Sequence, residues 1–321
     1  MKFVSLMAAL VLGAAACSTA VASYPEKPIR MVVGFAPGGS ADVNARLAAI
    51  TLSEILGKPV VVENRPGASG MIAVQAVARS EPDGHTLLFH SSGTHVITPH
   101  LVPVDPDPIA ALEPVARIGQ ISMVVLSNAE NGDKSIQDLA GKAKKAPGDL
   151  IYGSPGIGTT HQLVMELILQ KAGAKMTHVG YKGSAPGLQD LAAGRISYMV
   201  DTASTAKPFI DSNRAVPLAV TTAKRSELLP DVPSLTEAGF DVDASLWLGV
   251  SAPKGTPPEV LQRLNTAINE ALDASKHPLR EKLAASGWVD GGGSSSDFGR
   301  LIESESKQWK KVIETAGVTV N

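Results

Sequence analysis

Residues 34–42 read GFAPGGSAD and lie between an apolar run, Ile29–Val33, and a helical pattern that begins near Ser40. A strand that leads through a glycine-rich loop into a helix leaves the first N–H groups of that helix unpaired. These N–H groups and the helix dipole both favour negative charge. The stretch therefore predicts an α/β unit with an anion site where its strand ends.

The same order of strand, loop and helix occurs twice more. Residues 64–70, NRPGASG, follow the apolar run 60–62, and residues 154–160, SPGIGTT, follow the strand pattern 150–153. Two glycines around two small residues suit a backbone that approaches a ligand closely. Three helix starts at equivalent places predict that all three face one cleft and bind an anionic ligand there.

Short β-type runs alternate with amphipathic helical patterns through most of the chain, which favours mostly parallel sheets with helices on both faces. Two longer apolar runs, 116–126 and 246–252, predict strands that cross between two lobes. We expect a first lobe of residues 24–122 plus 248–321 and a second lobe of residues 123–247. Ligands of such folds bind beyond the carboxyl ends of the strands, here between the lobes.

Two capping patterns predict helix starts in the second lobe. Ser135 is followed three residues later by Asp138, and Ser234 by Glu237. In such a pair the serine side chain accepts a hydrogen bond from the backbone N–H three residues on, and the acidic side chain bonds back. We expect a helix after each serine, the second one ending at Gly239.

The first 22 residues predict a cleaved secretory signal. Lys2 is the only charge before the apolar stretch 6–16, and Ala20-Val21-Ala22 supplies small residues for cleavage after Ala22. The alternative is a lipoprotein modified at Cys17, although Ala14 stands where a leucine is usual. Cys17 is the only cysteine, so cleavage leaves a mature chain without thiols or disulfides. The segment predicts a location in the periplasm.

The remaining composition is that of an exported globular protein. About 300 residues are left, enough for two domains of ordinary size. Without Lys2 the chain has 28 basic and 31 acidic residues, a net charge of −3. No basic stripe is present, so we expect no nucleic-acid partner. We expect a monomer.

Enzymatic interpretations fit the motifs poorly. Residues 156–161 approach a dinucleotide fingerprint, but His161 replaces the third glycine, and residues 34–40 have P-loop spacing without its lysine. Ser91-Ser92-Gly93 lacks the flanking glycines of a nucleophile elbow. A spatial Ser–His–acid triad stays open, because its members need not be neighbours in sequence. We expect no catalytic residue and no cofactor.

Four histidines recur at intervals of five residues, at positions 85, 90, 95 and 100. Five residues turn a helix by about 500°, so the four share no helix face. On a strand they would alternate sides. We expect histidines of loops and turns rather than a metal site.

Charged residues near the loops allow two interpretations each. Asp42 is either an acid favoured by the helix dipole or a residue that shapes the pocket. Arg65 either pairs with a ligand carboxylate or is an exposed loop arginine. Lys182 either supplies a positive charge to the cleft or is solvated.

Six segments carry a family resemblance: YPEKPIRMVVGFAPGGSAD, VVVENRPGASG, PDGHTLL, YGSPGIGTTHQL, YKGSAPGLQDLAAGRI and LPDVPSLTEAGF. In this order they resemble the Bug family, the solute receptors of tripartite tricarboxylate transporters. The resemblance implies a two-lobed periplasmic binding protein of type II. Such a receptor closes around a small organic acid and delivers it to a membrane permease. Alternatives are a receptor that signals to a membrane sensor and, more remotely, an exported hydrolase.

The resemblance also implies the ligand-binding residues. A ligand carboxylate is held by the first two loops, largely through backbone N–H groups and water, and three further loops complete the pocket and tune its specificity. The implied residues are Phe35, Ala36, Pro37, Gly38, Gly39, Ser40 and Asp42; Asn64, Gly67, Ala68, Ser69 and Gly70; Ser91 and Ser92; Ser154, Gly158, Thr159 and His161; and Asp201, Thr202 and Ala203.

Overall fold

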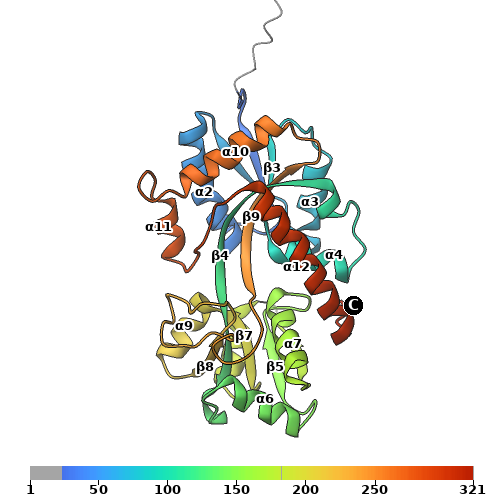
Figure 1. The fold of residues 1–321 in the computed structure, drawn as a ribbon, viewed down its shortest axis with the longest axis vertical. Coiled ribbons are helices and arrows are strands. Elements are labelled where there is room, and N and C mark those ends of the chain that lie inside the picture. The colour runs from blue at the N-terminus through green and yellow to red at the C-terminus, as the bar shows by residue number, and fades with distance from the viewer. Residues whose placement is uncertain (1–23, 182, 321) are drawn as a thin grey trace, which may run out of the picture.

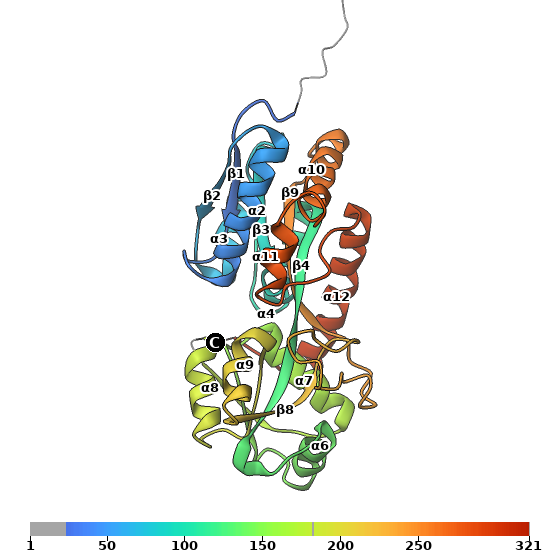
Figure 2. The ribbon, with the colours of Figure 1, turned by 90° about the vertical axis from the view of Figure 1, so that its left-hand side faces the viewer.

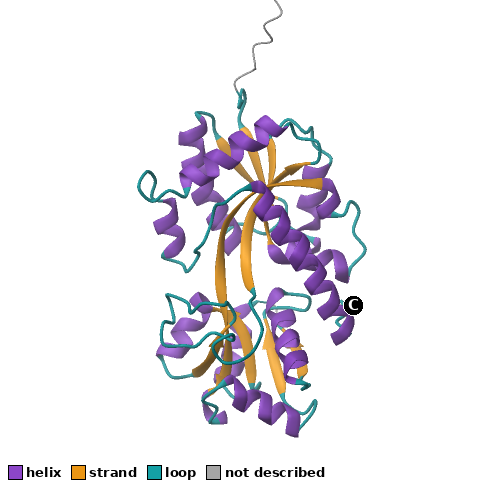
Figure 3. Cartoon of the chain, viewed as in Figure 1, coloured by secondary structure: helices purple, strands orange, loops and turns teal. Residues whose placement is uncertain are grey.

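The computed structural model describes residues 24–181 and 183–320. The predicted signal peptide, its cleavage site and Cys17 lie outside the described residues, as does Lys182. Helices cover the strands in both halves of the molecule (Figure 3). No helix within the described residues combines the length and the apolar character needed to cross a bilayer.

The described chain alternates strands with helices, as the sequence predicts. The strands are β1 (Ile29–Val33), β2 (Val60–Asn64), β3 (Thr86–Ser91), β4 (Leu112–Asn128), β5 (Ile151–Ser154), β6 (Thr177–Gly180), β7 (Tyr198–Thr202), β8 (Ala215–Val220) and β9 (Ser245–Pro253). The α-helices are α2 (Ser40–Leu56), α3 (Met71–Ala78), α4 (Thr98–Leu101), α5 (Pro108–Ala111), α6 (Ile136–Lys145), α7 (Thr160–Ala172), α8 (Ser184–Ala192), α9 (Ala203–Asp211), α10 (Pro258–Ala271), α11 (Leu279–Ala284) and α12 (Ser295–Ala316). Three short helical turns are η1 (Ala68–Gly70), η2 (Gly93–Ile97) and η3 (Ala129–Asn131).

Two lobes are joined by the long strands β4 and β9, which run between them (Figures 1 and 2). The strand order is β2-β1-β3-β9-β4-β7-β5-β6, and β8 also pairs with β4. The first lobe contains the parallel strands β2, β1 and β3, and the second contains the parallel strands β6, β5 and β7. The predicted α/β fold with two lobes is confirmed, and the crossing strands add antiparallel pairs to each sheet.

Strand β4 changes partners along its length. It pairs with β9 from Leu112 to Ser122, and from Met123 onward it pairs with β7. Beyond Val124 it is also bonded to β8. The strand is buried over most of its length, as a crossing strand in two sheets must be. It is longer than the apolar run at 116–126 that predicts it.

Helix α2 packs on the first sheet through small side chains. Its buried face includes Ala45, Ala48 and Leu52, whereas Val43 and Ile50 are 47% and 58% exposed. Alanines let the helix approach the sheet closely, so the larger side chains turn outward. The apolar residues at 43 and 50 mark the helix correctly but do not face the core.

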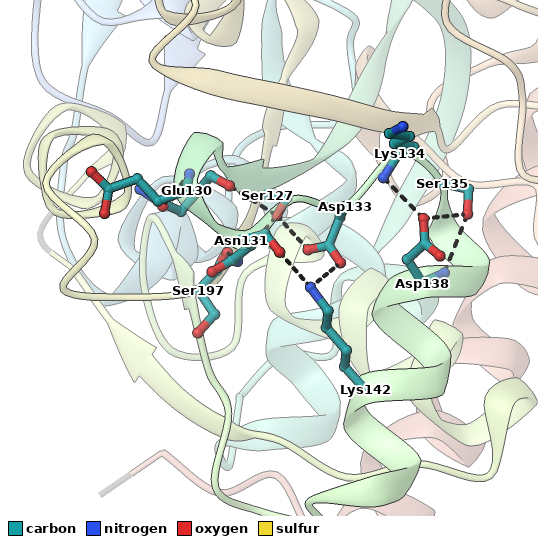
Figure 4. A network of polar contacts seen from close by, with 10 residues as sticks. Ser127, Glu130, Asn131, Asp133, Lys134, Ser135, Asp138, Lys142 and Ser197 are labelled. Atoms are coloured by element: carbon teal, nitrogen blue, oxygen red, sulfur yellow. Dashed lines mark hydrogen bonds and ion pairs between the residues drawn. The ribbon is translucent and has the colours of Figure 1, made fainter.

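The two predicted capping patterns have different outcomes. Ser135 accepts the N–H of Asp138 and begins α6, as predicted (Figure 4). Ser234 and Glu237 also exchange hydrogen bonds through their side chains and N–H groups. The segment that follows is only a turn, so the predicted helix there is wrong. Gly239, with φ of +82°, ends it before a helix can propagate.

The last helix, α12, connects the lobes a third time. It begins beside the first lobe, and its later residues pack with α7 of the second lobe (Figure 1). Gln170 of α7 donates a hydrogen bond to the carbonyl of Val312, at 3.1 Å. On the crossing strand β9, Trp247 donates from Nε1 to Glu305, at 2.8 Å. Helix α12 thus contacts both α7 and β9, one of the strands that join the lobes.

Candidate functional site

A cavity of about 360 Å³ lies between the lobes, beyond the carboxyl ends of β1, β3 and β5. Both lobes and the crossing strand β9 contribute to it. The lining residues are Phe35, Gly39, Ser40, Ala41, Ser69, Ser91, Gly93, Thr94, Thr98, Pro155, Ile157, Gly158, Thr159, Thr160, His161, Leu246, Leu248 and Trp288.

The backbones of the first two loops touch where the cavity begins. A Cβ atom at Gly34 would lie 2.6 Å from the Cα of Gly70, and one at Gly70 would lie 2.8 Å from the side chain of Thr94. Only glycine permits this approach, since real Cβ atoms do not come so close. Thr94 donates from its hydroxyl to the carbonyl of Ser69, at 3.0 Å, which joins the third loop to the second.

The second loop is strained at its centre. Ala68 and Ser69 have φ of +47° and +54°, a left-handed conformation that costs free energy for residues with a side chain. Such conformations gather at functional sites, where the surrounding structure enforces them. Ser69 lines the cavity, so the strained backbone lies at the cavity wall.

Helix α2 points its start into the cavity. Its N-cap is Gly39, which has no side chain to accept a hydrogen bond from the first turn. The N–H groups of Ser40 and Ala41 have no acceptor inside the helix, and both residues line the cavity. This helix start can therefore donate to an anion in the cavity.

Asp42 holds the first two loops together and does not line the cavity. Its carboxylate accepts from the N–H of Gly38 at 2.9 Å and from the side chain of Asn64 at 2.8 Å. Arg46, one turn further along α2, pairs with it at 2.9 Å. The hydrogen bond from Arg46 is the main reason that the pKa of Asp42 falls to about 2. Asn64 also donates to the carbonyl of Phe35, at 3.0 Å.

In the second lobe, helix α7 also begins at the cavity. Thr159 is its N-cap and accepts the N–H of Gln162, and the N–H of Gly158 donates to the Gln162 side chain at 2.7 Å. Thr160 and His161, in the first turn, line the cavity. Their N–H groups have no acceptor inside the helix. The cavity thus lies between helix starts from opposite lobes.

Asp201 lies behind this helix start and is fully buried. One of its oxygens accepts from the N–H of Thr202 at 2.7 Å and from the hydroxyl of Ser184 at 3.0 Å. The other has no partner within the described residues. Burial lowers the pKa of His161, and the nearby carboxylate of Asp201 opposes this shift. His161 is therefore a neutral ring at neutral pH.

Unpartnered polar atoms gather around this part of the cavity. Among the described residues, the hydroxyls of Ser92 and Thr160, both ring nitrogens of His161 and one oxygen of Asp201 are buried without a hydrogen-bond partner. Native proteins leave few buried polar groups unpaired, and each exception calls for an explanation. A ligand or bound water would supply the missing partners.

Apolar side chains form the rest of the wall. Leu246 and Leu248 reach it from β9, and Trp288 from the segment after α11. Phe35 and Ile157 contribute from the loops of the two lobes. Among the described residues that line the cavity, none carries a lysine, arginine or carboxylate side chain. The wall suits a ligand with an apolar body.

The structure brings eight of the residues implied by the resemblance to the cavity wall. These are Phe35, Gly39, Ser40, Ser69, Ser91, Gly158, Thr159 and His161. The others stand behind it, in the same loops or next to them: Ala36, Pro37, Gly38, Asp42, Asn64, Gly67, Ala68, Gly70, Ser92, Ser154, Asp201, Thr202 and Ala203.

Several lining residues are absent from the sequence-based set. Leu246 and Leu248 lie in the run predicted to cross, but no pattern indicated which face they present. Trp288 has no local motif at all. Thr94 and Thr98 follow the serine pair of the third loop, and their spacing of four residues is the only signal that could have found them.

Of the four histidines, His85 lies in the turn before β3, as expected, whereas the other three lie in regular elements. His90 lies in β3, His95 in η2 and His100 in α4. His90 stacks on His95 at 4.4 Å between ring centroids and bonds Ser251 at 2.8 Å. Within the described residues no cluster of His, Cys, Asp or Glu could hold a metal ion.

Arg65 pairs with Glu63, its neighbour at the end of β2. It does not line the cavity. Its side chain is 41% exposed. The structure therefore places Arg65 as an exposed loop arginine.

Comparisons with known proteins agree with this geometry. Residues 44–318 match the model of the tripartite tricarboxylate transporter family receptor, TctC. Protein BugT of Bordetella pertussis is 35% identical over 298 residues, covering 92% of this chain and 91% of BugT. An R. palustris protein solved with adipate, Rpa4515, is 37% identical with a TM-score of 0.77, covering 92% of this chain and 99% of that one. MatC of Rhodopseudomonas palustris, solved with bound malate, is 29% identical with a TM-score of 0.73, covering 90% of this chain and all of MatC (100%).

The chain belongs to the tripartite tricarboxylate transporter receptor family. This confirms the resemblance to the Bug family. Members of this family are periplasmic solute-binding proteins rather than enzymes.

Proposed function

We propose that this receptor captures a small organic carboxylate in the cavity between its lobes and closes around it. The observation that carries the proposal is the start of α2, where uncapped N–H groups line the cavity. Ser40 and Ala41 would donate to the ligand carboxylate through their N–H groups. The strained loop at Ser69 would complete this carboxylate site, which we call the cradle. The helix dipole adds to the attraction.

The residues behind the wall would shape this cradle. Asp42 and Asn64 tie the first two loops together, so we assign them a positioning role and no direct contact. The wall residues of the third and fourth loops, with Leu246, Leu248 and Trp288, would enclose the body of the ligand. Apolar enclosure favours acids with a carbon skeleton over inorganic anions.

Closure would be a hinge motion of the two lobes about β4 and β9. We propose lobe boundaries at residues 24–122 plus 248–321 and at residues 123–247. The change of partners on β4 between Ser122 and Met123 supports them. A ligand that contacts both lobes binds the closed state better and so favours closure.

Family membership supports the proposal that the receptor delivers its ligand to a membrane permease. The chain would act in the periplasm as a monomer, after cleavage of its signal peptide, and no cofactor is needed for the binding chemistry. A receptor that signals to a membrane sensor would use the same cavity. The relatives solved with adipate and malate support small aliphatic acids as the first ligands to test.

The test is a thermal-shift screen of the mature protein, emptied of ligand by unfolding and refolding, against about a hundred organic acids. A ligand at 100 times its dissociation constant stabilises the fold by about 2.7 kcal/mol, which is several degrees for a chain of this size. We expect one chemical family of hits, unchanged in mass after incubation. A folded, empty protein that no acid stabilises, or one that converts its ligand, would refute the proposal.

A further inference from the structure

We propose that Asp201, together with His161, makes the second lobe select a ligand end that donates hydrogen bonds, such as a hydroxyl or an ammonium group. The same pair disfavours a second carboxylate at that end. The inference rests on the proposed function, since it concerns the far end of an acid whose carboxylate lies at α2. The carboxylate of the ligand would lie at the start of α2, and its hydrogen-bond-donating end would lie near His161 and Asp201.

The carboxyl group of Asp201 accepts hydrogen bonds from residues at the starts of two helices, mainly from their hydroxyl groups. Ser184, which donates to it, is the first residue of α8, and Thr202, which also donates to it, is the N-cap of α9. Thr205, in the first turn of α9, donates to the same oxygen. These donors converge on one carboxylate oxygen. They leave the second oxygen of Asp201 without a partner among the described residues.

No cation balances this carboxylate within the described residues. The ion pairs of the second lobe are formed by other acids, namely Asp133, Asp190, Asp211, Glu237 and Asp241. The free oxygen of Asp201 is buried and lacks a partner. A carboxyl oxygen of this kind accepts hydrogen bonds, so a donor is the partner that would satisfy it.

His161 connects Asp201 to the cavity. It lies in the first turn of α7, lines the cavity, and has two ring nitrogens without partners. A neutral imidazole donates from one nitrogen and accepts at the other. If it turns its N–H toward Asp201, its second nitrogen presents an acceptor to the cavity. Thr160, its neighbour in the chain, adds an unpartnered hydroxyl.

The energetic consequence differs between two kinds of ligand. A hydroxyl or ammonium group satisfies acceptors that are otherwise buried and unpaired, and an unpaired buried group is costly. A second carboxylate offers mainly acceptors, so it would face the unpaired oxygen of Asp201 and the acceptor nitrogen of His161 without satisfying either of them.

The experiment compares acids that differ only at the far end. The probes are butyrate, 4-hydroxybutyrate, 4-aminobutyrate and succinate, and the six-carbon set hexanoate, 6-hydroxyhexanoate, 6-aminohexanoate and adipate. Dissociation constants are measured by calorimetry on the mature protein. For the chain length that fits the cavity, we expect the acid ending in a hydroxyl or ammonium group to bind about tenfold more tightly than the acid ending in a methyl group. We expect the dicarboxylate of that length to bind most weakly.

The variant Asp201→Asn tests the residue itself. Asparagine keeps an oxygen for Thr202, Ser184 and Thr205 and replaces the free oxygen by a donor. We expect it to lose the preference for the donor-ended acid about tenfold and to gain affinity for the dicarboxylate. The control is Asp211→Asn, which removes an equal charge from the exposed end of α9 and should leave the ranking unchanged.

The outcomes separate this inference from the proposed function. If the dicarboxylate binds as well as the donor-ended acid, or if none of the eight acids binds while others in the screen do, the inference is wrong and the receptor function stands. If no organic acid binds at all, the proposed function fails with it. Should Asp201→Asn not fold, the ranking measured on the unchanged protein decides alone.

Discussion

Each lobe has a buried aspartate close to the loops of the cavity, and among the described residues only the first-lobe aspartate is paired with a cation. Asp42 in the first lobe is 3% exposed and is paired with Arg46 one turn away on the same helix. Asp201 in the second lobe is fully buried and has no cationic partner within the described residues. Both accept from a backbone N–H group, Asp42 from a residue four positions before it and Asp201 from the residue that follows it.

The two acids differ in their surroundings although both lie near helix starts. In the first lobe Arg46 pairs with the acid, and the start of α2 lines the cavity. In the second lobe the acid lies at the end of β7, outside the glycine-rich loops, and has no cationic partner among the described residues.

The largest effect is expected from breaking the first-lobe cradle with Gly34→Ala. The added methyl would lie 2.6 Å from the backbone of Gly70, so the first two loops must separate. We expect ligand affinity to fall at least about a hundredfold and the free energy of unfolding to drop by about 3 kcal/mol. Calorimetry and denaturant unfolding measure both.

The matched control for this variant is Gly39→Ala in the same loop. A Cβ there has no neighbour closer than 3.5 Å, and Gly39 has an ordinary extended conformation as the N-cap of α2. We expect little change in stability and at most a few-fold change in affinity. Equal losses in both variants would mean that the close approach of Gly34 and Gly70 is not what holds the cradle.

The next effect is expected from Asp42→Asn, which removes the charge that pairs with Arg46 and one of the two oxygens that accept from Gly38 and Asn64. We expect the free energy of unfolding to fall by about 2 kcal/mol at pH 7, since Arg46 is half-exposed and water weakens the pair. Asparagine at 42 keeps only part of the link to Asn64. Calorimetric or denaturant unfolding at neutral pH gives the difference.

The stabilisation contributed by the Asp42 carboxylate depends on pH, and the sign of this dependence follows from the pKa of Asp42. The folded value of about 2 lies below the unfolded value of 3.8, so the stabilisation is complete above about pH 5 and is lost as the pH falls toward 2. The difference between the protein and Asp42→Asn should shrink over that range. A difference that stays constant down to pH 2 would contradict the role given to the carboxylate.

A third acid, which is partly buried, extends the comparison to the strands that join the lobes. Glu305 of α12 accepts from Trp247 of β9, and burial raises its pKa to about 7. The folded value exceeds the unfolded value of 4.5, so this acid destabilises the fold progressively as the pH rises from about 4.5 to 7. Glu305→Gln keeps an acceptor for Trp247 and carries no charge.

We expect Glu305→Gln to be more stable than the unchanged protein by about 1–2 kcal/mol at pH 8, and about equal to it at pH 4.5. Thermal unfolding across this range measures the effect. Ligand affinity should not change, because Glu305 does not line the cavity. A variant that is less stable at pH 8 would show that the charge of Glu305 supports α12 instead of weakening it.

Some parts of the site could be predicted because a sequence pattern determines their structure, and other parts could not. Glycine motifs report backbone conformation, so the loops at 34–42 and 64–70 and the helix starts after them were foreseen correctly. The role of Asp42 stayed open, because the pairing with Arg46 is one of several that a helix surface allows. The face of β9 that lines the cavity was not predictable, because a strand buried on both sides has no alternation of polar and apolar residues.

Tertiary packing accounts for the rest. Trp288 reaches the cavity because the chain after α11 returns to β4, where Val289 pairs with Gln120. No local pattern contains this contact. Val43 and Ile50 point outward because alanines are the better fit against the sheet. A hydrophobic period indicates a helix more reliably than it indicates the buried face of that helix.

The smallest effect is expected from Arg65→Ala, which tests whether a first-lobe cation beyond Arg46 contributes to anion binding. Arg65 pairs with Glu63 at the surface, and exposed pairs of this kind contribute about 0–1 kcal/mol. We expect the dissociation constant for any carboxylate hit to change less than about twofold and the stability to change by less than about 0.5 kcal/mol. A loss of tenfold or more in affinity would mean that Arg65 leaves Glu63 to pair with the ligand on closure. The anion preference of the first lobe would then rest on a side chain as well as on the start of α2.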